Sequence, residues 1–154
     1  MTIDSSYIKL PVDYLKQPDE YACVPTMLAM LFRHRDISTS PQTVISEFEG
    51  YDPLAGCTWE DTERYCTWKR VPMERTTGLL MPDIVRLLEH NVPVAASIPN
   101  FSDGYPHVVV LHGHNRKEFF MHDPYDAIRK EVSFSEFSWR WKERDNMLLY
   151  LPPK

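Results

Sequence analysis

The amino-acid sequence predicts an α+β domain with a helical N-terminal half and a C-terminal antiparallel sheet. Up to about residue 90, apolar residues recur at helical spacing behind proline and Ser/Thr start signals. From Val92 onward, the apolar residues gather into short runs rich in β-branched side chains, which are typical of strands. Helices first and strands later is the α+β order. The 154 residues suffice for one hydrophobic core, so we expect a single domain over residues 1–154.

The helical half follows an extended lead-in. Residues 7–16 partly alternate between apolar and polar and contain a proline, which indicates an edge strand or an extended segment. The start signals behind it predict four helices, over residues 25–32, 41–48, 58–69 and 81–90. In the first helix the apolar residues occupy nearly all faces, so we expect it in the core. In the third, Thr58 and Asp61 have the spacing of a capping box.

The second half supplies the strands. Apolar runs predict strands over residues 92–98, 107–112, 118–122 and 146–151, with a short helix at residues 134–141 before the last. Residues 107–112 and 118–122 should form a hairpin whose turn centres on Asn115 and Arg116. Residues 100–106 form a polar loop ahead of that hairpin, and we expect this loop to make one wall of a cleft.

Composition narrows the class of protein. A net charge of -5 and an isoelectric point near 5.6 do not suit a general nucleic-acid binder, which carries a basic patch. The first residues lack the pattern of a secretory signal, and no apolar run approaches the roughly 18 residues of a membrane span. Three scattered cysteines do not suggest a disulfide framework. We therefore expect a protein that is cytoplasmic as synthesised, with export by a non-Sec route or incorporation into a phage particle left open.

Cys23 is the first candidate for chemistry. It lies at or just before the first turn of the predicted core helix, where Pro25 is tolerated because its missing N–H is not needed. Thiols at helix N-termini have lowered pKa values, and the thiolate is the nucleophile. The alternative is a buried cysteine that acts as a small hydrophobic residue. A nucleophilic cysteine needs a base and a group that orients the base.

Hairpin geometry selects His107 as that base. With the turn centred on residues 115 and 116, His107 faces Pro124, and Asp123 lies one position away. The same register places no acid opposite the next two histidines, because it pairs His112 with Phe119 and His114 with Lys117. Gln17 lies six residues ahead of Cys23, across a turn, where its amide could serve as an oxyanion donor.

Several segments, in order, carry a family resemblance. They are the Gln17 to Cys23 spacing, residues 25–30, the strand 107–113, the pair Asp123-Pro124 and residues 132–139. Together they resemble the papain-like cysteine peptidases of the C39 type, best known as domains that cleave bacteriocin leader peptides after double glycine. The resemblance spans about residues 12–142. It implies a papain-like fold and a thiol-dependent amide or peptide hydrolase that uses no cofactor or metal.

The resemblance also implies the roles of single residues. Cys23 is the nucleophile, His107 the general base and acid, and Asp123 the orienting group. Gln17 is the oxyanion donor, together with the backbone N–H of Cys23. The expected partner is a peptide or protein substrate. The family commonly has Asp-Cys-Gly at the nucleophile, whereas this chain has Ala22-Cys23-Val24, so double-glycine specificity does not carry over with the fold.

Three other interpretations stay open at this point. If an amine instead of water resolves the acyl-enzyme, the same residues form a transferase. A papain-like domain can also be kept for binding, as a component of a larger secretion or phage assembly that docks both chain ends. A metal site could draw on the histidines, Asp123 and Cys57 or Cys66, but no pair has the close spacing typical of zinc sites. Otherwise we expect Cys57 and Cys66 to be structural thiols.

Overall fold

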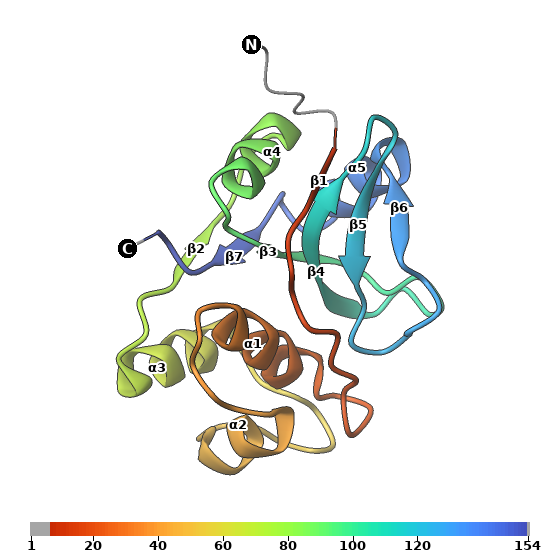
Figure 1. Cartoon of the computed structure of the whole chain (residues 1–154). Helices are drawn as coiled ribbons and strands as arrows, with labels where there is room; N and C mark the ends of the chain where they lie inside the picture. Colours follow the sequence, from red (N-terminus) through yellow and green to blue (C-terminus); the bar gives the residue numbers. More distant parts are fainter. Residues whose placement is uncertain (1–6, 154) are drawn as a thin grey trace.

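One antiparallel sheet runs through the computed structural model, which describes residues 7–153 (Figure 1). Within these residues, seven strands pair in the order β2-β7-β3-β4-β5-β6, and β1 pairs with β4. The strands are β1 (Ile8–Lys9), β2 (Glu74–Thr76), β3 (Val94–Pro99), β4 (Pro106–His114), β5 (Glu118–His122), β6 (Glu131–Ser133) and β7 (Leu148–Tyr150). Every pairing is antiparallel, which confirms the predicted α+β class. The sequence did not predict β2 and β6, because Glu74–Thr76 and Glu131–Ser133 are short and contain no apolar run.

The helices begin where the start signals place them. They are α1 (Cys23–His34), α2 (Pro41–Glu47), α3 (Trp59–Lys69), α4 (Met81–Glu89) and α5 (Phe134–Lys142). At α2, the Ser40 hydroxyl accepts a 3.1 Å hydrogen bond from the N–H of Thr43. At α3, the Thr58 hydroxyl accepts from the N–H of Asp61 and the Asp61 carboxylate accepts from the N–H of Thr58, at 3.0 and 3.2 Å. The predicted capping box is therefore present.

Apolar clusters lie on both faces of the sheet. On β4, Val108 and Val110 belong to the cluster built around α1. Val109 and Leu111 belong to the other cluster, with residues of α4 and α5. This division follows from the alternation of side chains along a strand.

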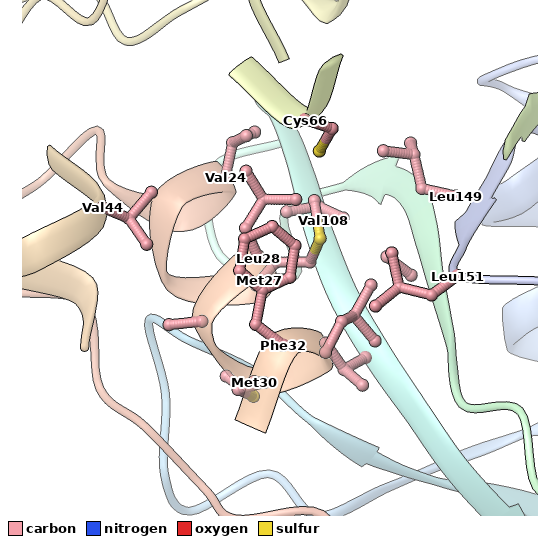
Figure 2. Packing of buried hydrophobic residues seen from close by; sticks show 14 of the residues in the cluster. Val24, Met27, Leu28, Met30, Phe32, Val44, Cys66, Val108, Leu149 and Leu151 are labelled. Carbon is pink, nitrogen blue, oxygen red and sulfur yellow. The ribbon is translucent and has the colours of Figure 1, made fainter. Parts of the chain in front are cut away.

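The first helix is enclosed on all sides. Every residue of α1 from Val24 to Phe32 is buried, and Figure 2 shows Met27 and Leu28 close to Val108 of β4. In Figure 1, α1, α2 and α3 lie together below the sheet. Close packing of this kind fixes the helix in place, and with it the residue at its head.

The β4–β5 hairpin has a different register from the predicted one. His114 pairs with Phe119 instead of Lys117. His112 lies at an irregularity in the ladder, a bulge, and does not pair with Phe119. The predicted partners of both histidines were therefore wrong, because the turn lies later than predicted and the bulge changes the register again between Leu111 and Gly113.

Asn115 sets the turn of this hairpin. Its side-chain oxygen accepts hydrogen bonds from the N–H groups of Lys117 and Glu118, at 2.8 and 2.9 Å. This Asx-type turn centres about one residue later than predicted. Strand β5 ends at His122, so Asp123 is the first residue after it. This places Asp123 at the end of the hairpin where β4 begins.

The lead-in lies along β4 as an extended segment. The N–H of Leu10 donates to the carbonyl of His112 at 2.7 Å, beyond the two-residue strand β1. Gly113 permits this close passage, because a Cβ at that position would clash with the carbonyl oxygen of Ile8. The segment ends at Gln17, whose N–H donates to the carbonyl of Pro124 at 2.8 Å.

Two stacked histidines, His112 and His122, lie next to the extended segment of residues 7–16, and one of them binds its backbone. The rings of His112 and His122 stack with centroids 4.1 Å apart, and His122 Nε2 donates to the carbonyl of Val12 at 2.6 Å. Burial and the neighbouring His122 lower the pKa of His112 to about 4, and burial also lowers the pKa of His122. Both rings are therefore neutral at pH 7.

Among the helices of residues 7–153, none combines the length and apolar character needed to cross a membrane. Residues 1–6 and 154 lie outside the described residues, and so does the prediction that both chain ends are docked.

Candidate active site

Cys23 is the first residue of α1, at the position that the sequence predicts. The N-cap residue is Ala22, which has no side-chain acceptor, so no side chain caps the first turn of the helix. Free N–H groups and the positive end of the helix dipole favour an anion at such a position. Cys23 is partly exposed, whereas the helix that carries it is buried. The thiol is thus accessible but rigidly mounted.

His107 and Asp123 form a buried pair. Nε2 of His107 lies 2.6 Å from Oδ1 of Asp123, and the two side chains are only 4% and 2% exposed. His107 lies near the beginning of β4, and Asp123 directly follows β5. Because Nε2 is bound to the carboxylate, Nδ1 is the ring nitrogen left for the thiol of Cys23.

Two tyrosines hold Asp123 and His107 in place. The N–H of Tyr125 donates to Oδ1 of Asp123 at 2.9 Å, and the Tyr125 ring and the imidazole pack in a T-shaped arrangement with centroids 6.5 Å apart. The Tyr14 hydroxyl donates to the main-chain carbonyl of Asp123 at 2.8 Å. Sequence reasoning missed both tyrosines. The Asx turn at Tyr125 follows a recognisable local pattern, but Tyr14 lies 109 residues from its partner and no local signal points to it.

Opposing influences set the protonation state of His107. Burial lowers the pKa of the imidazole, but the hydrogen bond to Asp123 and the neighbouring Cys23 outweigh burial and raise the pKa to about 9. His107 is therefore protonated at neutral pH. The arrangement places a buried cation next to a cysteine, as an activated thiol nucleophile requires.

Gln17 lies near Cys23 and His107, but its side-chain amide binds the backbone of the turn that follows it. Its Nε2 donates to the carbonyls of Asp19 and Glu20, at 2.8 and 3.0 Å. Among the described residues, its buried Oε1 has no hydrogen-bond partner. Both amide hydrogens thus hold the turn that leads to Cys23. To donate to an oxyanion, Gln17 would have to exchange one of these two carbonyl acceptors.

A cleft of about 720 Å³ joins these groups. Its lining includes Gln17, Cys23 and His107, and it is bounded by residues 55–60 and by residues 100–106, the loop predicted to form one wall. Asp123 lies behind His107. Arg144 also lines the cleft, and sequence reasoning did not single it out.

The other two cysteines have a different character. Burial raises the pKa of Cys57 to about 12, and burial likewise raises the pKa of Cys66 to about 12. Both are therefore neutral thiols at physiological pH, although Cys57 lines the cleft. Within residues 7–153, no three His, Cys, Asp or Glu side chains gather closely enough to hold a metal ion.

A protein-family model matches most of the chain. The model of the Peptidase_C39 like family matches residues 9–148. A comparison with the sequences of curated proteins gives no significant match.

Solved structures share this fold over nearly their whole length. A protein from Bacillus anthracis described as a C39-like peptidase superimposes with a TM-score of 0.74 at 15% identity, covering 96% of this chain and 98% of that one. The peptidase domain of Streptococcus ComA, a bi-functional ABC transporter of a quorum-sensing pathway, gives 0.67 at 16% identity and covers 96% and 99%. A double glycine motif protease from the AMS/PCAT transporter, in complex with the leader peptide, gives 0.55 at 16% identity and covers 94% of both chains. These likenesses establish the fold.

Proposed function

Because the chain belongs to the Peptidase_C39 like family, we propose that it is a cysteine peptidase, a thiol-dependent hydrolase of peptide amide bonds. The observation that carries the proposal is the buried contact of 2.6 Å between His107 and Asp123, next to a cysteine at an uncapped helix head. A merely structural histidine would not need a buried carboxylate on one nitrogen and a thiol beside the ring. In this proposal Cys23 is the nucleophile, His107 the general base and acid, and Asp123 the orienting group.

The first half of the reaction forms a thioester. In the resting site the thiol proton is already on Nδ1 of His107, so the sulfur of Cys23 attacks the carbonyl carbon of the scissile amide as the thiolate of an ion pair. The carbonyl oxygen becomes an oxyanion at the head of α1, where the backbone N–H of Cys23 can donate to it. The C–N bond then breaks, and protonated His107 gives its proton to the leaving amine.

The second half of the reaction restores the thiol. His107 removes a proton from water, the hydroxide attacks the thioester carbon, and the C–S bond breaks as the sulfur recovers a proton. Gln17 would assist both tetrahedral intermediates after one of its amide hydrogens leaves the carbonyl of Asp19 or Glu20. If an amine replaces water, the same steps give a transferase.

The substrate is proposed to be a peptide or protein other than a double-glycine leader. The AMS/PCAT protease is bound to a leader peptide. In this chain, however, the buried side chain of Val24 lines the cleft directly beside Cys23. A side chain at this position restricts how closely a substrate backbone can approach the helix head, so cleavage after two glycines is not expected.

A peptide-library digestion tests the proposal. The protein is incubated with a mixed-sequence peptide library, and new termini are identified by mass spectrometry. The wild type should generate products, Cys23→Ala should generate none, and Cys66→Ala, which removes a thiol outside the cleft, should still cleave. Thermal unfolding of each variant checks that it is folded. Products that persist in Cys23→Ala, or a folded wild type that cleaves nothing, would overturn the proposal and favour a domain kept for binding.

A further inference from the structure

Arg144 is a fixed arginine at the wall of the cleft. It lies in the turn between α5 and β7, where its N–H donates to the carbonyl of Trp141 and its carbonyl accepts from the N–H of Met147. Its side chain extends to β3, where Nε donates to the hydroxyl of Ser97 at 3.4 Å. The two backbone hydrogen bonds hold the main chain of Arg144 in place. The hydrogen bond to Ser97 orients its side chain, which lines the cleft.

The guanidinium has no acidic partner. Among residues 7–153, no carboxylate lies within 4.0 Å of Arg144, whereas Arg75 and Arg140 contact Glu63 and Glu136 at 2.6 and 2.8 Å. A guanidinium has five N–H donors in a planar fork, and within residues 7–153 only one of them, Nε–H, has an acceptor. The side chain is partly buried, so its remaining donors are incompletely hydrated. A ligand carboxylate matches such a fork with two parallel hydrogen bonds.

This charge lies close to the proposed reacting groups. Ser97, which the guanidinium contacts, pairs with Val108 across β3 and β4. Val108 directly follows His107, and both line the same cleft. Paired residues on neighbouring strands have Cβ atoms about 5 Å apart. A group bound by Arg144 is therefore within a few residues of the scissile amide of a bound peptide.

The acidic residues of the cleft limit how much negative charge a ligand can carry. Glu20, Glu60 and Asp103 also line it, but all three are exposed at its rim, and Glu60 lies 3.7 Å from Arg75. These acids would repel a strongly anionic ligand. A ligand with a single carboxylate, placed inside the cleft, would meet the arginine instead.

We propose that Arg144 is a substrate-binding residue that takes one carboxylate of a peptide, from an Asp or Glu side chain or from the chain end, close to the bond that Cys23 attacks. This inference rests on the proposed function, in which the cleft binds the peptide substrate. The site selects peptides with one acid near the scissile bond and disfavours polyanionic segments.

The test uses bromoacetyl peptides that alkylate Cys23. Matched pairs carry Asp or Asn, or Glu or Gln, at zero to two glycines from the reactive group, and mass spectrometry follows the rate of modification. At one spacing, the acid should react about tenfold faster than its amide, since a charge-assisted bidentate contact at a partly hydrated site is of that order. The ratio should fall to about one in Arg144→Met and recover in part in Arg144→Lys. Arg116→Met, which removes an exposed charge at the hairpin tip, should leave the ratio unchanged.

Acetyl peptides of the same sequences separate this inference from the proposed function. They cannot alkylate, so their binding does not depend on the reactivity of Cys23. The Nε–H signal of Arg144 in NMR spectra, identified by its loss in Arg144→Met, should shift with the acids and not with the amides. An inert Cys23 together with this shift would overturn the peptidase but keep the carboxylate site. Equal effects of acids and amides, in rates and in spectra, would overturn the carboxylate site itself.

Discussion

Replacing Asp123 by Asn should release His107 from its protonated state. The substitution keeps a side-chain oxygen for the imidazole and for the N–H of Tyr125, but it removes the negative charge. In the wild type, the bond to Asp123 is the largest influence that raises the pKa of His107, against burial, which lowers it. Without that bond to a charged acceptor, burial prevails.

The expected change is large. The pKa of His107 should fall from about 9 to about 6.5 or below. A change of this size alters the protonation equilibrium by a factor of roughly 300. At pH 7.5, His107 is almost entirely imidazolium in the wild type and would be mostly neutral in Asp123→Asn. Peptide cleavage should drop about a hundredfold, since a positioned acid–base group contributes about 10²–10⁴ in rate.

Long-range proton–nitrogen NMR spectra follow the ring nitrogens of His107 between pH 5 and about 10. Its signals are assigned by their loss in His107→Gln. Asp126→Asn, which removes a carboxylate from the same loop, serves as the matched control and should leave the titration near pH 9. A titration midpoint of His107 that stays above pH 8 in Asp123→Asn would refute the electrostatic account of the pair.

Three further variants test the framework of the site. Between pH 6.5 and pH 4, the free energy of unfolding of the wild type, measured with urea, should fall by about 2 kcal/mol more than that of His112→Phe. The reason is that His112 takes up a proton near pH 6.5 in the unfolded chain but only near pH 4 in the folded protein. Parallel pH profiles of the two proteins would contradict this. Gly113→Ala should cost about 1–3 kcal/mol in the same assay through its clash with Ile8, and an unchanged unfolding midpoint would exclude that close passage. Thr58→Ala should cost about 1 kcal/mol in thermal unfolding by removing the cap of α3, whereas Thr67→Ala in the same helix should cost clearly less; equal losses would argue against the cap.

Local patterns predicted the features that depend on local contacts. The cap of α3 joins Thr58 and Asp61, three residues apart, so the sequence shows both partners together. The burial of α1 follows from apolar residues on nearly all of its faces. Cys23 could be placed at the helix head because Pro25 marks the first turn.

Features that depend on register or rotamers could not be predicted in this way. The bulge at His112 changes the hairpin pairing without a clear local signal. Gln17 reaches the cleft as expected, but the sequence does not show that its amide prefers the carbonyls of its own turn. Arg144 enters the cleft because β7 pairs with β3, a contact between segments about fifty residues apart, and only the fold shows that neighbourhood.

The most direct test of the central claim compares the alkylation of the three cysteines by iodoacetamide at pH 6. Mass spectrometry resolves the rate at each site in the wild type and in His107→Ala. Cys57 and Cys66, with pKa values of about 12, should hardly react. The account predicts that Cys23 reacts at least about a hundredfold faster than either, and that the rate at Cys23 itself falls at least about tenfold in His107→Ala. Equal rates at all three sites, or a rate at Cys23 that is unchanged in His107→Ala, would contradict a nucleophile activated by the buried histidine.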